Sequence, residues 1–149
     1  MKKILIIIGI VLLIILIYFA LPQNNAYKSY AYINGQKFNI EIAKTDAEKE
    51  IGLSKYNKIS DDFGMYFPFG SSNYYSFWMK DMKFPIDIIY LNKNEVVQIF
   101  KNAPIPNNRE DELEIYRNQN PADSVLEINA NLSNKYSIKI GDIININYK

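Results

Sequence analysis

The chain has 149 residues, a formal net charge of +1 and neither cysteine nor histidine, which leaves room for one membrane segment and one compact domain. The missing cysteine excludes disulfides, a thiolate nucleophile and a thiolate zinc site, and the missing histidine excludes a Ser-His-Asp triad and an imidazole proton shuttle. The near-neutral charge, without a cluster of lysine and arginine, argues against nucleic acid as a partner.

The N-terminal segment contains an uninterrupted apolar run over residues 4–21. As a helix this run would be roughly 27 Å long, close to the hydrocarbon thickness of a bilayer. Lys2 and Lys3 precede it, which predicts a cytoplasmic N-terminus. We therefore expect residues 1–26 to form a single-pass anchor with a short linker and residues 27–149 to form one domain outside the membrane. The alternative is a cleaved signal and a secreted domain, although no clean small-x-small cleavage site follows the run.

The first part of the domain predicts a β-hairpin and a short helix. Asn34-Gly35 is the preferred pair for a two-residue type I′ turn, and it joins an aromatic-rich strand over 27–33 to an alternating strand over 36–43. Thr45 and Glu48 fit a capping box at the start of a helix that should end at about residue 53. A polar connection over 54–62 follows.

The remainder of the chain predicts a succession of strands. They are expected over residues 64–69, 74–80, 85–91, 95–100, 124–128 and 143–148. Residues 102–122 lack a hydrophobic period and contain three prolines, which predicts a long exposed loop, and a short helix is expected over 131–136. The expected fold class is mainly β (α+β): a compact antiparallel β-barrel or sandwich with two short helices, preceded by the N-terminal transmembrane helix.

Six short motifs follow one another from about residue 36 to the end of the chain. They are Ile51-Gly52-Leu53, Gly64-Met65-Tyr66-Phe67-Pro68-Phe69, Ser76-Phe77-Trp78-Met79-Lys80, Pro85-Ile86-Asp87-Ile88, Val125-Leu126-Glu127 and Ile138-Lys139-Ile140-Gly141-Asp142. In this order the chain resembles the family called domain of unknown function 192, or uncharacterised protein family 0127. The resemblance implies a small exported or membrane-anchored β-rich domain and no particular reaction. The chain departs from the family at Asp81-Met82, where Asn-Thr is usual, and in lacking the cysteines that many relatives carry in the proline-rich loop.

The strand over 74–80 presents one mixed face. Alternation places Tyr74, Ser76, Trp78 and Lys80 on the same side, away from the core side chains between them. An accessible indole at Trp78 would stack on a sugar or another planar group. The alternative interpretation is a boundary tryptophan with Lys80 packed over it as a cation–π partner.

Asp87 lies in a run that is apolar on both faces, so we expect its carboxylate to be at least partly buried and therefore paired. Lys80, Arg117 and the backbone amides at the Lys83-Phe84 turn are the candidate partners. A structural ion pair or turn clamp is one interpretation, and a general acid or base poised by burial is the other. Asp81 and Asp87 together would supply the two carboxylates of a glycosidase.

Two hypotheses for function follow. In the first, Trp78, Lys80, Asp87 and Ser76 line the binding site of a non-enzymatic, extracytoplasmic accessory module of the cell envelope. Its partners would be the membrane, through residues 4–21, and an envelope polymer or a membrane protein. The second is a hydrolase of an envelope glycan or peptide, with Asp87, Lys80 and Asp81 as catalytic candidates within hydrogen-bond reach. No metal or other cofactor is expected, because the acidic stretch over 110–114 lacks EF-hand spacing and its glycine.

Overall fold

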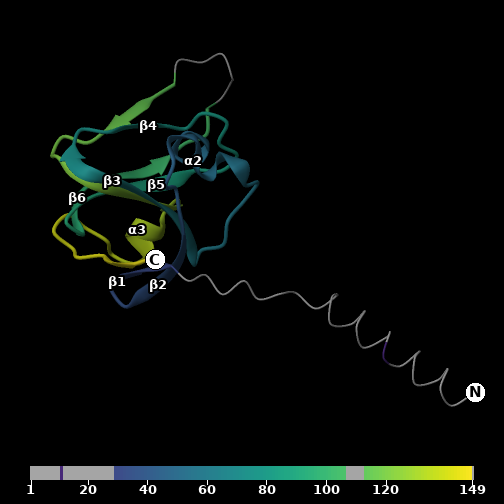
Figure 1. The fold of residues 1–149 in the computed structure, drawn as a ribbon, viewed down its shortest axis with the longest axis horizontal. Coiled ribbons are helices and arrows are strands. Elements are labelled where there is room, and N and C mark those ends of the chain that lie inside the picture. The colour runs from purple at the N-terminus through teal and green to yellow at the C-terminus, as the bar shows by residue number, and fades with distance from the viewer. Residues whose placement is uncertain (1–10, 12–28, 107–112, 149) are drawn as a thin grey trace, which may run out of the picture.

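The computed structural model describes residues 11, 29–106 and 113–148 (Figure 1). Its strands are β1 (Tyr30–Ile33), β2 (Gln36–Ile42), β3 (Phe63–Asn73), β4 (Ser76–Trp78), β5 (Ile86–Asn92), β6 (Glu95–Ala103), β7 (Ile115–Arg117), β8 (Ala122–Asn129) and β9 (Asn145–Asn147). The helices are α2 (Asp46–Ile51) and α3 (Leu132–Lys135), with a 3₁₀ turn η1 (Gly52–Lys55) directly after α2.

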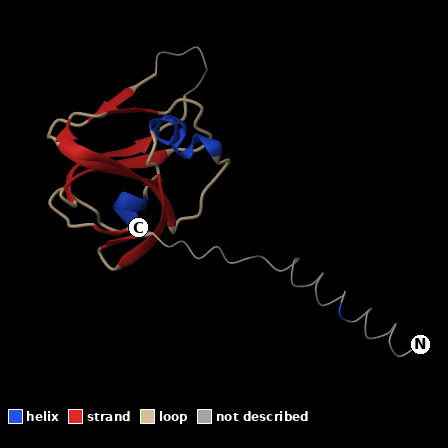
Figure 2. Ribbon diagram, viewed as in Figure 1, coloured by secondary structure: helices blue, strands red, loops and turns tan. Residues whose placement is uncertain are grey.

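The strands form one curled sheet and one small ribbon (Figure 2). Seven strands make the sheet in the order β6-β5-β8-β3-β2-β1-β9, and among the described strands β4 pairs only with β7. The predicted mainly β fold with two short helices is confirmed, and the sheet curls into a half-barrel. One pair departs from the expected antiparallel arrangement: β2 and β3 are parallel, because the α2–η1 crossover returns the chain in the same direction.

The central strands β3, β5 and β8 contribute to a buried cluster on each face of the sheet. The face toward α3 holds a cluster that includes Phe38, Ile89, Leu126 and Leu132. The opposite face holds a second cluster, which the ribbon covers and in which Leu53 of η1 is buried. A strand in the middle of such a sheet is mostly apolar on both faces. The six residues of β5 from residue 86 to 91 are all buried, and Asp87 is the charged residue among them.

Local signals predicted the first elements correctly. Asn34 and Gly35 have φ of 47° and 81°, as a type I′ turn requires. The capping box is present, since the Glu48 amide donates to Thr45 Oγ1 at 3.2 Å and the Thr45 amide donates to Glu48 Oε2 at 2.8 Å.

The region predicted as one long loop is more ordered than expected. Strand β6 extends to Ala103, and β7 forms within the predicted loop at residues 115–117. A strand of three residues shows no hydrophobic period, so the sequence pattern missed it. The predicted strand over 74–80 is also shorter than expected, because only residues 76–78 pair with β7.

The predicted anchor over residues 4–21 lies outside the described residues, apart from Val11. Within the part of the chain that the structure describes, no helix has the length and apolar character needed to cross a membrane.

Candidate functional site

The outer face of the β4–β7 ribbon combines exposed apolar and polar side chains. Across the two strands, Trp78 lies opposite Ile115 and Ser76 lies opposite Arg117. Trp78 is 43% exposed and Ile115 is 52% exposed, although both side chains are large and apolar. The Arg117 guanidinium lies 5.7 Å from the centre of the Tyr74 ring, which is a cation–π distance. We call Tyr74, Ser76, Trp78, Ile115 and Arg117 the ribbon face.

The inner side of the ribbon is fixed to the sheet by aromatic packing and a buried hydroxyl. Phe77 packs edge-on against Phe67 at 5.2 Å and against Tyr90 at 5.8 Å between ring centres. The Tyr90 hydroxyl donates to the carbonyl oxygens of Tyr116 at 2.6 Å and Tyr75 at 3.1 Å. Burial raises the pKa of Tyr90, so this hydroxyl stays protonated and can donate at physiological pH.

A second clamp, at one end of the ribbon, joins the segment that leads into β4 to the segment that follows β7. The Asn118 side chain is buried, and its Oδ1 accepts from the Tyr75 amide at 2.7 Å. Its Nδ2 donates to the carbonyl oxygens of Asn73 at 2.9 Å and Asn120 at 2.6 Å. The segments that enter and leave the ribbon are therefore tied to one side chain, which orients the ribbon face before any ligand arrives.

Lys80 and Asp81 follow the ribbon in an exposed turn. Asp81 has φ of 58°, and the Met82 amide closes the turn by donating to the Met79 carbonyl at 3.2 Å. The cation–π pairs among the described residues do not include Lys80 and Trp78. The alternative interpretation, with Lys80 packed over Trp78, is therefore not observed, and the indole keeps its accessible surface.

Asp87 is buried, as expected, but its partners are not the predicted ones. Its Oδ1 accepts from the amides of Asn102 at 2.8 Å and Asn131 at 3.2 Å. Its Oδ2 accepts from the Ser133 amide at 2.8 Å. The carboxylate thus clamps the start of α3 and the end of β6 through three backbone donors, and the ion pairs among the described residues do not include it.

The structure does not bring Asp87 to the side of the sheet that carries Trp78, which corrects the expected cleft of Trp78, Lys80 and Asp87. Asp87 pairs with Ile128 across β5 and β8 and faces α3. The next residue of β5, Ile88, points to the opposite face and belongs to the cluster under the ribbon. Alternation along one strand therefore separates Asp87 from the ribbon face. Neither Lys80 nor Asp81 is among the hydrogen-bond partners of Asp87, so the geometry that the hydrolase hypothesis requires is not observed.

The sheet buries a second acid that the sequence analysis did not single out. Glu127 is 5% exposed and lies between Ile88 and Met65 in the strand register, on the side under the ribbon. None of the hydrogen bonds among the described residues ends on its carboxyl group. Burial raises the pKa of Glu127 to about 8, so the group is mostly neutral at pH 7. The signal in the sequence was an acid two residues after Val125, within the otherwise apolar run from residue 125 to 128.

Two glycines make room around Glu127. A Cβ at Gly52 would lie 3.9 Å from Glu127 Oε2 and 3.6 Å from the Phe67 ring, so this turn of η1 passes directly over the carboxyl group. A Cβ at Gly64 would lie 2.6 Å from the Glu127 carbonyl oxygen, so only glycine allows β3 and β8 to approach this closely. Motifs that are far apart in the sequence, around residues 52, 64 and 127, therefore meet at one buried acid.

The other acidic positions act locally where they are described. Asp142 Oδ2 accepts from Asn34 Nδ2 at 2.9 Å and from the Lys139 amide at 3.0 Å, and these bonds lower the pKa of Asp142. Glu114 accepts from the Tyr116 hydroxyl at 2.8 Å, and residues 110–112 of the predicted acidic stretch lie outside the described residues. Among the residues that are described, no three acidic side chains gather in a way that could hold a metal ion.

Comparison with known proteins identifies one family. The model of the DUF192 family, described as "Uncharacterized ACR", matches residues 30–146. No curated protein matches the chain.

Two solved structures resemble the fold. A protein of unknown function from Novosphingobium aromaticivorans is 31% identical, with a TM-score of 0.69 over 78% of this chain and 82% of that chain. A proposed transcription regulator from Sinorhizobium meliloti is 24% identical, with a TM-score of 0.71 over 83% of this chain and 98% of that chain. At the second level of identity the likeness concerns the fold alone.

Proposed function

The chain belongs to the DUF192 family of uncharacterised proteins, so its function must be inferred from the arrangement of its own residues. We propose that it is a non-enzymatic binding module and that the ribbon face is its recognition surface. The single observation behind this proposal is the exposure of Trp78, at 43%, on a ribbon that two buried clamps hold in place. Exposed apolar side chains rimmed by polar groups are typical of interaction sites.

The ribbon face suits a glycan that carries acidic groups. The flat indole of Trp78 offers a stacking surface to the apolar side of a sugar ring. Arg117 presents a planar set of donors that matches a carboxylate or a phosphate. Ser76, opposite Arg117, adds a hydroxyl that both donates and accepts.

The proposal includes the location of the domain. We propose that residues 4–21 anchor the chain as a single-pass segment with a cytoplasmic N-terminus, and that the domain lies outside, where envelope polymers are the available ligands. The length of the apolar run and the two lysines before it support this placement.

The hydrolase hypothesis has less support. Its central residue, Asp87, uses both carboxylate oxygens to hold backbone amides on the α3 side of the sheet. A group with three structural hydrogen bonds in a buried position is a poor general acid or base for a substrate on the ribbon side.

The test is binding of soluble peptidoglycan fragments to the full chain in detergent. The chain has one tryptophan, so binding at the ribbon face should change its fluorescence. Isothermal calorimetry should show at least a tenfold weaker affinity for Trp78→Ala. Tyr32→Ala is the matched control, because Tyr32 is also 43% exposed but lies on β1. Equal affinities of the two variants, or no binding by the wild-type chain, would refute the proposal.

A further inference from the structure

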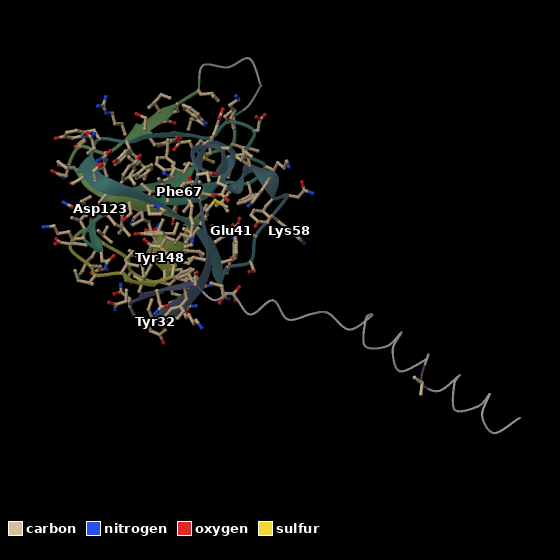
Figure 3. The ribbon with its side chains drawn as sticks, viewed as in Figure 1. Tyr32, Glu41, Lys58, Phe67, Asp123 and Tyr148 are labelled. Carbon is tan, nitrogen blue, oxygen red and sulfur yellow. The ribbon has the colours of Figure 1, made fainter. Side chains whose placement is uncertain are left out.

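A second exposed apolar surface lies at the β1–β2 end of the domain, where the described part of the domain begins. Ile140 is 66% exposed, Ile143 is 54% exposed and Tyr32 is 43% exposed. Figure 3 shows Tyr32 at this end of the domain. We call these three residues the lower surface.

Hydrogen bonds hold the segments of the lower surface together. Asn34, in the β1–β2 turn, donates to Asp142 Oδ2 at 2.9 Å and to the Ser137 carbonyl at 3.3 Å. The Gly141 amide donates to the Val96 carbonyl at 2.9 Å, which joins the same segment to the β5–β6 hairpin. Three turns from distant parts of the chain therefore form one fixed surface.

The isoleucines of this surface are not needed by the core. Their neighbours Ile138 and Ile144 are buried at 2% and 0% exposure and already fill the cluster on the α3 face. Ile140 and Ile143 lie in the same segment but are exposed to solvent. Exposing these apolar side chains to water is unfavourable, and polar residues in the turn would avoid it.

Lysines flank the apolar residues. Lys37 and Lys139 are both exposed, and the Lys37 ammonium lies 4.7 Å from the centre of the Tyr30 ring. The nearby Asp142 carboxylate is already bound to Asn34 and to a backbone amide. Isoleucine, tyrosine and lysine together are typical of a surface at the boundary between lipid and water.

An anchor over residues 4–21 would keep this end of the domain close to the membrane, because the linker is short. Only residues 22–28 separate the apolar run from Ser29, where the described domain begins. Seven residues span at most about 25 Å. Ser29 leads directly into β1, which carries Tyr32.

We propose that the lower surface rests on the phospholipid headgroups of the membrane that residues 4–21 enter, an inference that depends on the proposed anchor. Lipid contact at this end would orient the whole domain. The β4–β7 ribbon and the β1–β2 hairpin lie at opposite ends of the domain (Figure 1), so the ribbon face would point away from the bilayer.

The absence of cysteine allows a clean test with single labels. The full chain is reconstituted in vesicles of phosphatidylethanolamine and phosphatidylglycerol (3:1), with one fluorophore on a cysteine introduced by Ile140→Cys or Ile143→Cys. Ile115→Cys, on the ribbon face and 52% exposed, is the matched control. A lipid with a spin label on its headgroup should quench the first two labels at least threefold more than the control.

The possible results test the lipid contact of the lower surface and the membrane anchor independently. If alkaline carbonate leaves the chain in the vesicles and all three labels are quenched equally, the anchor stands and the lower surface does not face lipid. If carbonate releases the chain, the anchor is wrong and the inference falls with it. If the labels at residues 140 and 143 are instead quenched without spin-labelled lipid, and this quenching falls when the chain is reconstituted at a lower ratio of protein to lipid, two copies of the chain are in contact there and the proposal is overturned.

Discussion

Replacement of Glu127 by glutamine should abolish most of the pH dependence of folding stability between pH 5 and pH 8. The Glu127 residue is 5% exposed, and its carboxyl group lies beneath the turn at Gly52. Burial raises its pKa from the ordinary 4.5 to about 8. The folded state therefore keeps a proton that the unfolded chain loses above pH 4.5. The stabilisation from Glu127 is complete below pH 4.5, decreases as the pH rises, and is lost above about pH 8.

The size of the effect follows from the shift. One pKa unit corresponds to about 1.4 kcal/mol, so the free energy of unfolding should fall by roughly 3 kcal/mol between pH 5 and pH 7.5. For a domain of about 120 residues this lowers the melting temperature by roughly 10 °C. Glutamine has nearly the same shape and cannot ionise. The variant should therefore match the wild-type chain within about 1 kcal/mol at pH 5 and exceed its stability at pH 8.

Few other ionisable groups should contribute to the pH dependence of stability between pH 5 and pH 8. The chain has no histidine, and hydrogen bonds lower the pKa of Asp61 and Asp142. Groups with lowered pKa contribute stability that is lost only as the pH falls through their folded pKa, on the acid side of the window. The other acid beside Met65 in the strand register, Glu41, is bound by Lys55 and by the Tyr56 hydroxyl.

Urea denaturation followed by circular dichroism at pH 5, 6, 7 and 8 measures the slope. Glu50→Gln is the matched control, because Glu50 is exposed on α2, and this variant should keep the wild-type slope. If the stability of the wild-type chain is constant or rises over this range, Glu127 is not a buried neutral acid. If the slope persists in Glu127→Gln, another group is responsible for it.

Three further substitutions test the clamps and the close approach of the strands. Asp87→Asn should lower the free energy of unfolding by roughly 3 kcal/mol, since an amide nitrogen cannot accept from backbone amides; an unchanged urea midpoint would contradict the clamp. Gly64→Ala should cost about 3 kcal/mol or more, because its Cβ would lie 2.6 Å from the Glu127 carbonyl oxygen, and a wild-type midpoint would show that the strands can separate freely. Tyr90→Phe removes the hydroxyl that donates to the ribbon, so it should cost about 1 kcal/mol and lower the fluorescence anisotropy of Trp78. An anisotropy equal to that of the wild-type chain would mean that packing alone fixes the ribbon.

The sequence predicted best the features that depend on neighbouring residues. The Asn34-Gly35 turn and the Thr45–Glu48 capping box are satisfied within a few residues of chain, and both form as predicted. The buried position of Asp87 also followed from its apolar strand. Its partners did not, because Asn131 and Ser133 reach it only through tertiary folding.

The candidate site depended on pairings that no local pattern reveals. Strand β7 is stabilised by pairing with β4, about forty residues earlier in the chain, so the segment looked like loop. The separation of Asp87 from Trp78 follows from the ribbon leaving the sheet to cover one face. The burial of Glu127 could have been predicted from the sequence, since the residues on either side of it are apolar, as they are around Asp87.

The position of β1 in the sheet affects how the domain would bear mechanical force. A ligand held by the ribbon and a membrane anchor at the N-terminus would pull on the domain from opposite ends. The load would enter through β1, which pairs with β2 on one side and with β9 on the other. The pulled strand is therefore not at the sheet edge, and two hydrogen-bonded ladders must fail before it can leave. The C-terminal strand occupies the edge, where no tension is applied.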